Sequence, residues 1–150
     1  MQLTIMRHGE AGHHPVDTQR ALTGQGLAQV QETARQLRAQ GVRPVRIWSS
    51  PYLRARQTAD VVSEILEAPV EHHNTLTPDS DPDALRESLE TVASETGIML
   101  VSHMPFVNGL TGLFLEGKLG GYPYDTAQAR VLEMEYPAWG VAIATGPRRD

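Results

Sequence analysis

Two arginines and two histidines stand where apolar runs end, and together they could carry out phosphoryl chemistry. Arg7, His8 and Gly9 follow the run in "MQLTIM", Arg54 lies in "SSPYLRARQTA" and His103 lies in "VSHMP". An arginine fork matches phosphate oxygens, and each charge-assisted hydrogen bond contributes about 1.5–3 kcal/mol. A neutral imidazole can attack phosphorus and form a covalent phosphohistidine. We therefore expect a cationic pocket with one histidine as nucleophile and the other as a donor to the oxyanion.

Short β-prone runs precede these residues, and helical patterns separate them. Strands are predicted at residues 2–6, 45–48 and 98–101, and apolar stripes at helical spacing fall within 27–37, 55–66 and 85–93. A further helix is expected at 105–115, and "ARVLEMEY" and "GVAIAT" flank the turn-like "PAWG". The pattern predicts one α/β domain over residues 1–150, with three α/β/α layers, a mostly parallel sheet and an antiparallel C-terminal hairpin.

The predicted topology explains how distant residues could meet. The carboxyl ends of parallel strands share one edge, where open α/β sheets bind ligands. His8 and His103 are therefore expected to converge with the two arginines. Gly9, without a Cβ, would let the backbone approach the phosphoryl group. Pro105 would begin a helix whose positive end lies near the anion.

Composition excludes several other kinds of chemistry. The 150 residues include no cysteine, so there is no thiolate nucleophile and no cysteine-ligated metal. A net charge of −5 without a basic run argues against nucleic-acid binding. No secretory leader or membrane span is visible, which predicts a cytoplasmic, non-membrane protein. The pairs His13-His14 and His72-His73 lack metal-ligand spacing, so neither a metal nor another cofactor is expected.

The motifs resemble those of the histidine phosphatase superfamily, which includes the phosphoglycerate mutases. The resemblance rests on "MRHGEA", "RALTGQG", "SPYLRARQTA", "TLTPDSDPDAL" and "LVSHMPFV", from residue 1 to about 110, whereas the last 40 residues add only a compatible length. It implies a phosphoglycerate mutase-like fold in which His8 is the nucleophile and His103 the second histidine. It also implies that Arg7 and Arg54 clamp the phosphate. Arg20, in "RALT", is implied at the rim of the pocket.

Within the superfamily, the short chain is similar to bacterial phosphohistidine phosphatases, which implies a phosphorylated histidine phosphotransfer protein or domain as partner. Other branches carry a proton-donating Glu on an insertion or an Asp after the second histidine, but here Met104 follows His103. Phosphohistidine needs such an acid less than an ester does, because its leaving imidazole can already be protonated. Asp17, Asp79 and Asp81 are fallback donors.

Two alternative functions stay open on the sequence alone. One is a phosphatase for small phosphomonoesters, and the other is a phosphate- or phosphoprotein-binding module without turnover. A mutase is not expected, because the chain lacks insertions that would enclose a sugar phosphate. We expect a monomer whose specificity comes from loops 10–20, 72–81 and 116–126, and whose activity falls at acidic pH as His8 becomes protonated. Glu10 has no assigned role.

Overall fold

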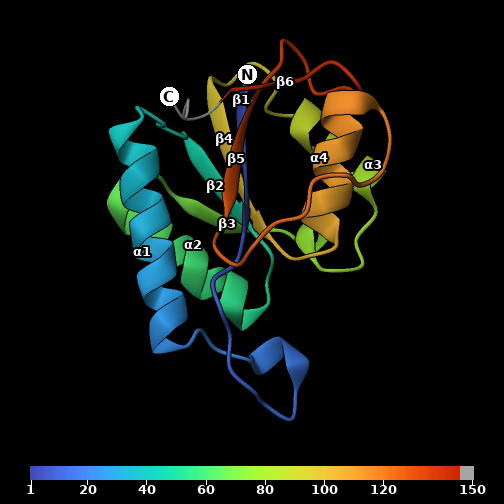
Figure 1. Ribbon diagram of the computed structural model, residues 1–150. Helices are drawn as coiled ribbons and strands as arrows, with labels where there is room; N and C mark the ends of the chain where they lie inside the picture. Colours follow the sequence, from blue (N-terminus) through green and yellow to red (C-terminus); the bar gives the residue numbers. More distant parts are fainter. Residues whose placement is uncertain (146–150) are drawn as a thin grey trace.

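A six-stranded sheet lies between two layers of helices in the computed structural model, which describes residues 1–145 (Figure 1). The strands are β1 (Gln2–Arg7), β2 (Arg46–Ser49), β3 (Val70–His72), β4 (Gly97–Ser102), β5 (Ala129–Glu133) and β6 (Ile143–Ala144). The helices are α1 (Gly24–Ala39), α2 (Leu53–Leu66), α3 (Pro82–Glu90) and α4 (Phe106–Glu116), with short 3₁₀ helices η1 (Asp17–Gln19) and η2 (Asn74–Leu76). Within residues 1–145, no helix is long and apolar enough to cross a bilayer.

The sheet has the strand order β3-β2-β4-β1-β5-β6. The first four of these strands run parallel, whereas β5 is antiparallel to β1 and β6 is antiparallel to β5. The mostly parallel sheet and the antiparallel C-terminal hairpin are thus confirmed. The sequence did not reveal β3, which has only three residues, and η2 interrupts the segment 72–81 that was expected to lack structure.

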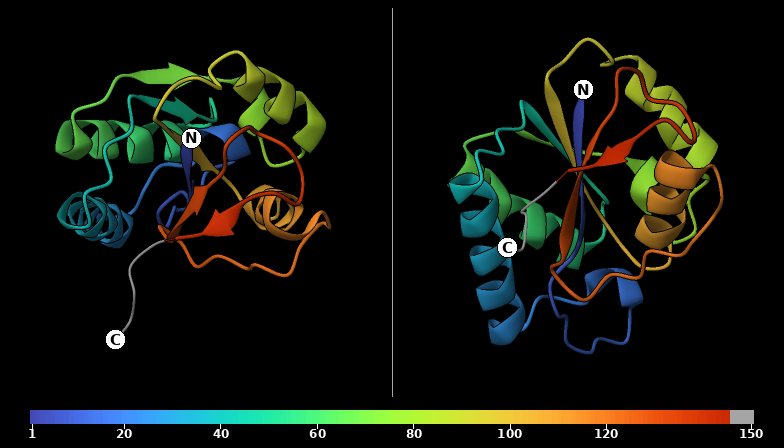
Figure 2. Two further views of the ribbon diagram at one scale, coloured as in Figure 1. Left: turned by 90° about the horizontal axis from the view of Figure 1, so that it is seen from above. Right: turned by 45° about the horizontal axis from the view of Figure 1, so that its top comes forward.

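Helices cover both faces of the sheet, as Figure 2 shows, with α1 and α2 on one side and α3 and α4 on the other. Successive side chains of a strand point to opposite faces. Ile98 and Leu100 therefore pack in the core beside α3 and α4, whereas Met99 and Val101 pack in the core beside α1 and α2. A strand buried on both faces needs a continuous apolar run, which explains the "IMLV" of β4.

Local signals set the start and the end of α1. The Thr23 side chain accepts a hydrogen bond from the peptide N–H of Gly26, which satisfies a free donor of the first turn. Gly41 follows the helix with a φ of +86°, a conformation that suits glycine. The helix that precedes β2 is therefore fixed at both ends by its own sequence.

The carboxyl ends of β1, β2 and β4 lie at the same level. Arg7 pairs with Ser102 and Ser49 pairs with Val101 in the register of the sheet. Backbone hydrogen bonds carry the pairing one residue further, from His8 N–H to Ser102 O at 3.0 Å and from Ser50 N–H to Val101 O at 3.0 Å. Both α2 and α4 begin just beyond this edge, so their positive ends are close to it.

Candidate active site

His8, Arg54 and His103 meet at this edge of the sheet, as the topology predicted. The centroids of the two imidazole rings are 5.1 Å apart, and the Arg54 Nε–H donates to His8 Nε2 over 3.3 Å. The exposed fractions are only 8% for His8, 5% for Arg54 and 1% for His103. Because buried polar side chains are costly unless they are paired or functional, this cluster is the strongest candidate for a reactive site.

One hydrogen bond settles the tautomer of His8. Its Nδ1 lies 2.7 Å from the carbonyl oxygen of Gly9. A carbonyl oxygen only accepts, so Nδ1 carries the proton and Nε2 keeps its lone pair. The Arg54 Nε–H, which points at Nε2, agrees with that assignment. The nucleophilic atom of a neutral His8 is therefore Nε2.

Burial also keeps His8 neutral. It lowers the pKa of His8 from 6.5 to about 4, and the charges of Arg54, Arg7 and Arg20 act in the same direction against the hydrogen bond to Gly9. At neutral pH the lone pair on Nε2 is consequently present in essentially every molecule. The acid-side loss of activity expected from the sequence is thereby displaced to lower pH than an ordinary histidine would give.

Arg7 is the last residue of β1 and is held by the loop that precedes β5. Its Nη1 donates to the carbonyl oxygen of Tyr124 over 2.8 Å. Its buried Nε has no hydrogen-bond partner among residues 1–145. Burial lowers the pKa of Arg7 while the charge of Asp125 raises it, but a guanidinium stays charged at neutral pH. Arg7 is thus a cation that is held in place by one N–H and has a further N–H, on Nε, with no partner among the described residues.

Arg54 is held by Asp17, which the sequence offered only as a fallback proton donor. Arg54 Nη1 donates to the Asp17 carbonyl oxygen over 2.9 Å, and Nη2 lies 3.3 Å from its carboxylate. Arg20 Nη1 also contacts this carboxylate, at 3.3 Å, so Arg20 lies at the edge of the site. An incoming phosphoryl group would need the same donors. Asp17 therefore fixes the side chains of Arg20 and Arg54 in place. A bound phosphoryl group would compete with its carboxylate for their N–H donors.

Asp17 is poorly suited to donate a proton. Slight burial raises its pKa, but the hydrogen bond from Arg20 and the charge of Arg54 outweigh this and lower it. Asp79 accepts a hydrogen bond from Thr77 Oγ1 over 3.0 Å, and Asp81 accepts from the peptide N–H of Asp83 over 3.0 Å. All three carboxylates expected as possible donors thus have partners: Asp17 binds cations, Asp79 accepts within its own loop and Asp81 caps the first turn of α3.

The residues that surround His103 had no role assigned from the sequence. Its Nε2 lies 2.7 Å from Ser50 Oγ, and the Tyr52 ring meets the imidazole edge-on at 4.9 Å between centroids. Its buried Nδ1 has no partner within the described chain. Burial lowers the pKa of His103 to about 3, and the charges of His8 and Arg54 add to this. The sequence gives no signal that a serine after a strand, such as Ser50, will contact a histidine as distant in the chain as His103.

Packing gives Gly9 a further reason to be glycine, beside the approach to a phosphoryl group that the sequence suggested. A Cβ on Gly9 would lie 2.7 Å from the Gly26 carbonyl oxygen and 2.8 Å from Val30 Cγ2, so the residue is required for packing against α1. Its peptide N–H donates to Thr58 Oγ1 over 3.1 Å, and that hydroxyl donates to the Arg54 carbonyl oxygen over 2.8 Å. Gly9 therefore locks the end of β1 onto α1 and α2.

Glu10 also has a structural role. Its peptide N–H donates to Gln29 Oε1 over 3.0 Å, and its carboxylate accepts from Thr23 Oγ1 over 3.1 Å. Both partners belong to α1 or to its N-cap, and the Glu10 carbonyl oxygen accepts from the Thr23 N–H as well. Glu10 thus fixes the chain that leaves the site to the start of α1.

The remaining histidines lie in loops or at an edge of the sheet. His13, His14 and His72 are exposed, and His14 Nδ1 accepts from the Val16 N–H over 2.9 Å. His73 stacks on Trp48 with 4.2 Å between ring centroids. Among residues 1–145, no three His, Asp or Glu side chains are grouped to hold a metal ion.

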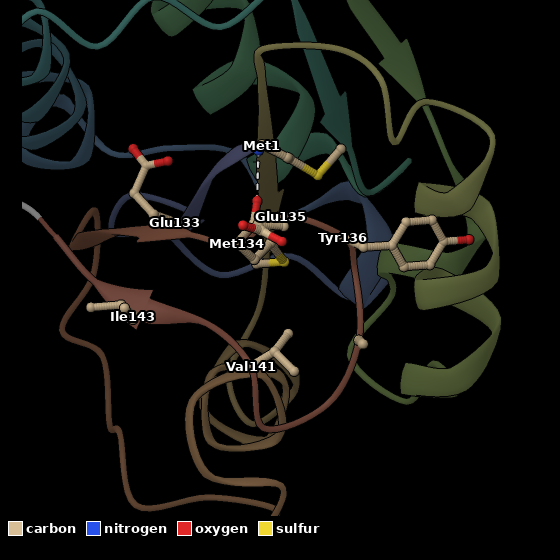
Figure 3. A pocket seen from close by; sticks show the side chains of 8 residues that line it. Met1, Glu133, Met134, Glu135, Tyr136, Val141 and Ile143 are labelled. Carbon is tan, nitrogen blue, oxygen red and sulfur yellow. Dashed lines mark hydrogen bonds between the residues drawn. The ribbon is translucent and has the colours of Figure 1, made fainter.

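A separate hollow of about 670 Å³ opens beside the amino end of β1 (Figure 3). It lies at the opposite end of the sheet from His8, and the Met1 amino group donates there to the Met134 carbonyl oxygen over 2.6 Å. Its lining carries carboxylates but neither arginine nor histidine: Met1, Glu133, Met134, Glu135, Tyr136, Ala138, Val141 and Ile143. The arginine and histidine cluster described above therefore lies outside this hollow, at the carboxyl edge.

The sequence of this chain matches a known protein family. The sequence model of the histidine phosphatase superfamily (branch 1) matches residues 3–77. Phosphohistidine phosphatase SixA of Escherichia coli (strain K12) is 33% identical over 123 residues, which cover 79% of this chain and 76% of that protein.

Solved structures agree with the sequence match. The structure of the protein histidine phosphatase SixA complexed with tungstate superposes with a TM-score of 0.89 at 28% identity, over 97% of this chain and 95% of that chain. The alpha-ribazole phosphatase of Shigella flexneri superposes with a TM-score of 0.75 at 17% identity, over 97% and 95% of the two chains, which shows the fold alone. The α/β fold implied by the sequence motifs is thus confirmed. The chain therefore belongs to the histidine phosphatase superfamily and is a phosphatase.

Proposed function

We propose that the protein hydrolyses phosphohistidine in other proteins through a covalent intermediate on His8. In the first step, His8 Nε2 attacks phosphorus, a new N–P bond forms and the N–P bond of the substrate breaks. The leaving imidazole departs as a neutral ring when its remote nitrogen is already protonated. In the second step, water attacks the phosphorus on His8, which releases inorganic phosphate and restores the free imidazole.

The hydrogen bond between His8 Nδ1 and the Gly9 carbonyl oxygen carries the proposal. It leaves the lone pair on Nε2, on the side of the ring where the Arg54 guanidinium lies. The unprotonated Nε2 is therefore the atom that could attack a phosphoryl group bound by that arginine. The same bond holds the ring in one orientation, so little reorganisation is needed for attack.

The surrounding groups suit a phosphoryl group that gains charge during transfer. Arg7 and Arg54 supply guanidinium donors, and His103 offers a buried Nδ1 without a partner in the described chain. The amino ends of α2 and α4 add positive potential at the same edge. In a site with little water, donors placed in advance are worth more than the same donors in bulk solvent.

The engaged carboxylates favour a phosphoramidate over an ester as substrate. An ester oxygen leaves poorly without a positioned acid, and such an acid contributes typically 10²–10⁴-fold. Asp17 is held ionised by Arg20 and Arg54, so it does not supply that proton. The similarity to phosphohistidine phosphatase SixA supports the same class. A histidine phosphotransfer domain is the partner that we propose, and a cytoplasmic location and a monomeric state stay predictions.

A parallel assay tests the proposal. The protein is incubated with a phosphorylated histidine phosphotransfer domain, with p-nitrophenyl phosphate and with a phosphoglycerate, and released phosphate is measured for each. We expect kcat/KM to be highest for the phosphorylated domain. His8→Ala should abolish turnover, whereas Gln36→Ala, at an exposed position in the last turns of α1, should leave it unaltered.

Each alternative function predicts a different pattern in this assay. Faster turnover of the small esters would identify a phosphomonoester phosphatase. Tight binding of the phosphorylated domain without phosphate release would identify a binding module. Retention of full phosphohistidine hydrolysis by His8→Ala would refute the mechanism itself.

A further inference from the structure

We propose that Ser50 is a positioning residue that holds His103 as the tautomer protonated on Nδ1, so that this N–H faces a phosphoryl oxygen as a donor. The inference rests on the proposed function for the identity of its anion. It concerns one hydrogen bond, however, that can be observed without any substrate.

Ser50 is completely buried in the short segment between β2 and α2. Its Oγ accepts a hydrogen bond from the Tyr52 N–H over 3.2 Å and lies 2.7 Å from His103 Nε2. These are the hydrogen bonds of Ser50 Oγ within residues 1–145. The hydroxyl therefore already accepts from a backbone donor, and its own proton needs an acceptor.

Only one tautomer of His103 satisfies that proton. If Nε2 carried the ring proton, Ser50 Oγ would receive two donors, and its own hydroxyl hydrogen would have no acceptor among the described residues. If Nε2 is unprotonated, the hydroxyl donates to it and every group in the pair is satisfied. An unmet buried donor costs about 1–3 kcal/mol, which is enough to select one tautomer. The ring proton therefore resides on Nδ1.

The placement of the proton decides what His103 can do. Burial lowers the pKa of His103 to about 3, so at neutral pH the ring is neutral and has a single N–H. Were that N–H on Nε2, Nδ1 would present a lone pair to the phosphoryl oxygens and repel them. With the proton on Nδ1, the atom that lacks a partner in residues 1–145 becomes a donor. A neutral histidine can then stabilise the transferring group.

Two aromatic neighbours keep the ring from turning. Tyr52 packs edge-on against His103 with 4.9 Å between centroids and an angle of 64°, and His8 does so with 5.1 Å and 65°. A rotation of the imidazole would break the contact with Ser50 and disturb both neighbours. Ser50 and Tyr52 thus belong to one short segment that orients His103.

Nitrogen NMR tests the inference on the free protein. With ¹⁵N-labelled histidine, long-range ¹H–¹⁵N correlations distinguish an Nδ1–H ring from an Nε2–H ring. We expect His103 to be protonated on Nδ1 in the unaltered protein and to shift toward a mixture of tautomers in Ser50→Ala. Ser49→Ala is the matched control, because it removes a buried serine hydroxyl that donates to the Ser50 carbonyl oxygen and not to His103. That variant should keep the Nδ1–H ring.

Kinetics supply the second readout. In Ser50→Ala we expect kcat on a phosphorylated histidine phosphotransfer domain to fall roughly 10–100-fold, as is typical when a partner that orients a functional residue is lost. The value of KM should change little. Ser50→Thr, which keeps the hydroxyl, should restore most of the rate, and thermal unfolding shows whether each variant is folded.

Opposite results would overturn the inference. It fails if His103 carries its proton on Nε2 in the unaltered protein, or if Ser50→Ala leaves both the tautomer and kcat unchanged. If the protein does not hydrolyse phosphohistidine, the NMR result is unaffected. Failure of the tautomer assignment is therefore distinguishable from failure of the proposed function.

Discussion

Acid should destabilise this protein through its two buried histidines. Burial lowers the pKa of His8 from 6.5 to about 4 and that of His103 from 6.5 to about 3. Between pH 6.5 and about 4, these two histidines are therefore protonated in the unfolded chain but stay neutral in the native state. The free energy of unfolding is unaffected by these groups above pH 6.5 and decreases as the pH falls below it.

The size of the effect follows from the same shifts. A histidine that stays neutral in the native state lowers the free energy of unfolding by about 2 kcal/mol between pH 7 and pH 5. The two histidines together approach the lower end of the total stability of an ordinary domain, about 5–15 kcal/mol. Because each charge also acts on the other ring, the joint effect should be read from a double variant and not from single ones.

Urea unfolding at pH 7, 6 and 5 measures this loss. The double variant His8→Gln/His103→Gln should lose clearly less stability over this range than the unaltered protein, because glutamine does not titrate. His72→Gln, at an exposed histidine, should follow the unaltered protein. Identical losses for the unaltered protein and the double variant would refute the reasoning that burial keeps these rings neutral.

Three further predictions concern the same edge of the sheet. On the acid side, kcat/KM should hold down to about pH 5 and fall only below that, because the free enzyme loses its nucleophile near the lowered pKa of His8, about 4. An acid-side decline centred at pH 6.5 would contradict this. Gly9→Ala should lower the free energy of unfolding by about 1–3 kcal/mol in urea titrations, since its Cβ would meet Gly26 and Val30. Gly24→Ala, where a Cβ meets nothing within 4 Å, is its control, and equal stability of the two variants would refute the packing role. Asp17→Asn should strengthen inhibition by inorganic phosphate roughly two- to fivefold, because exposed ion pairs are weak, and unchanged inhibition would show that Asp17 does not compete for Arg54.

The meeting of three predicted reactive residues could be foreseen because it follows from topology. Strand ends and helix patterns are local signals, and a parallel sheet brings such ends to one edge. His8, Arg54 and His103 accordingly meet although nearly a hundred positions separate the first from the last. The N-cap of α1 at Thr23 is likewise a local feature, since a cap is defined within a few residues.

The contacts of those residues could not be foreseen, because they depend on side-chain geometry. The reason for Gly9 lies in its distance to Gly26 on another element. The closeness of Ser50 to His103 Nε2 depends on the path of the chain between β2 and α2. Burial, which sets the pKa of His8, is a property of the whole fold and not of the triplet Arg-His-Gly.

Direct detection of a phosphorylated His8 tests the central claim. The protein is mixed with a phosphorylated histidine phosphotransfer domain, quenched within a turnover, and digested at alkaline pH, at which phosphohistidine survives, for mass spectrometry. The mechanism predicts an acid-labile phosphate on the peptide that contains His8, absent from His8→Ala. Turnover of the substrate with no phosphate ever found on His8, or with phosphate on another residue instead, would contradict it.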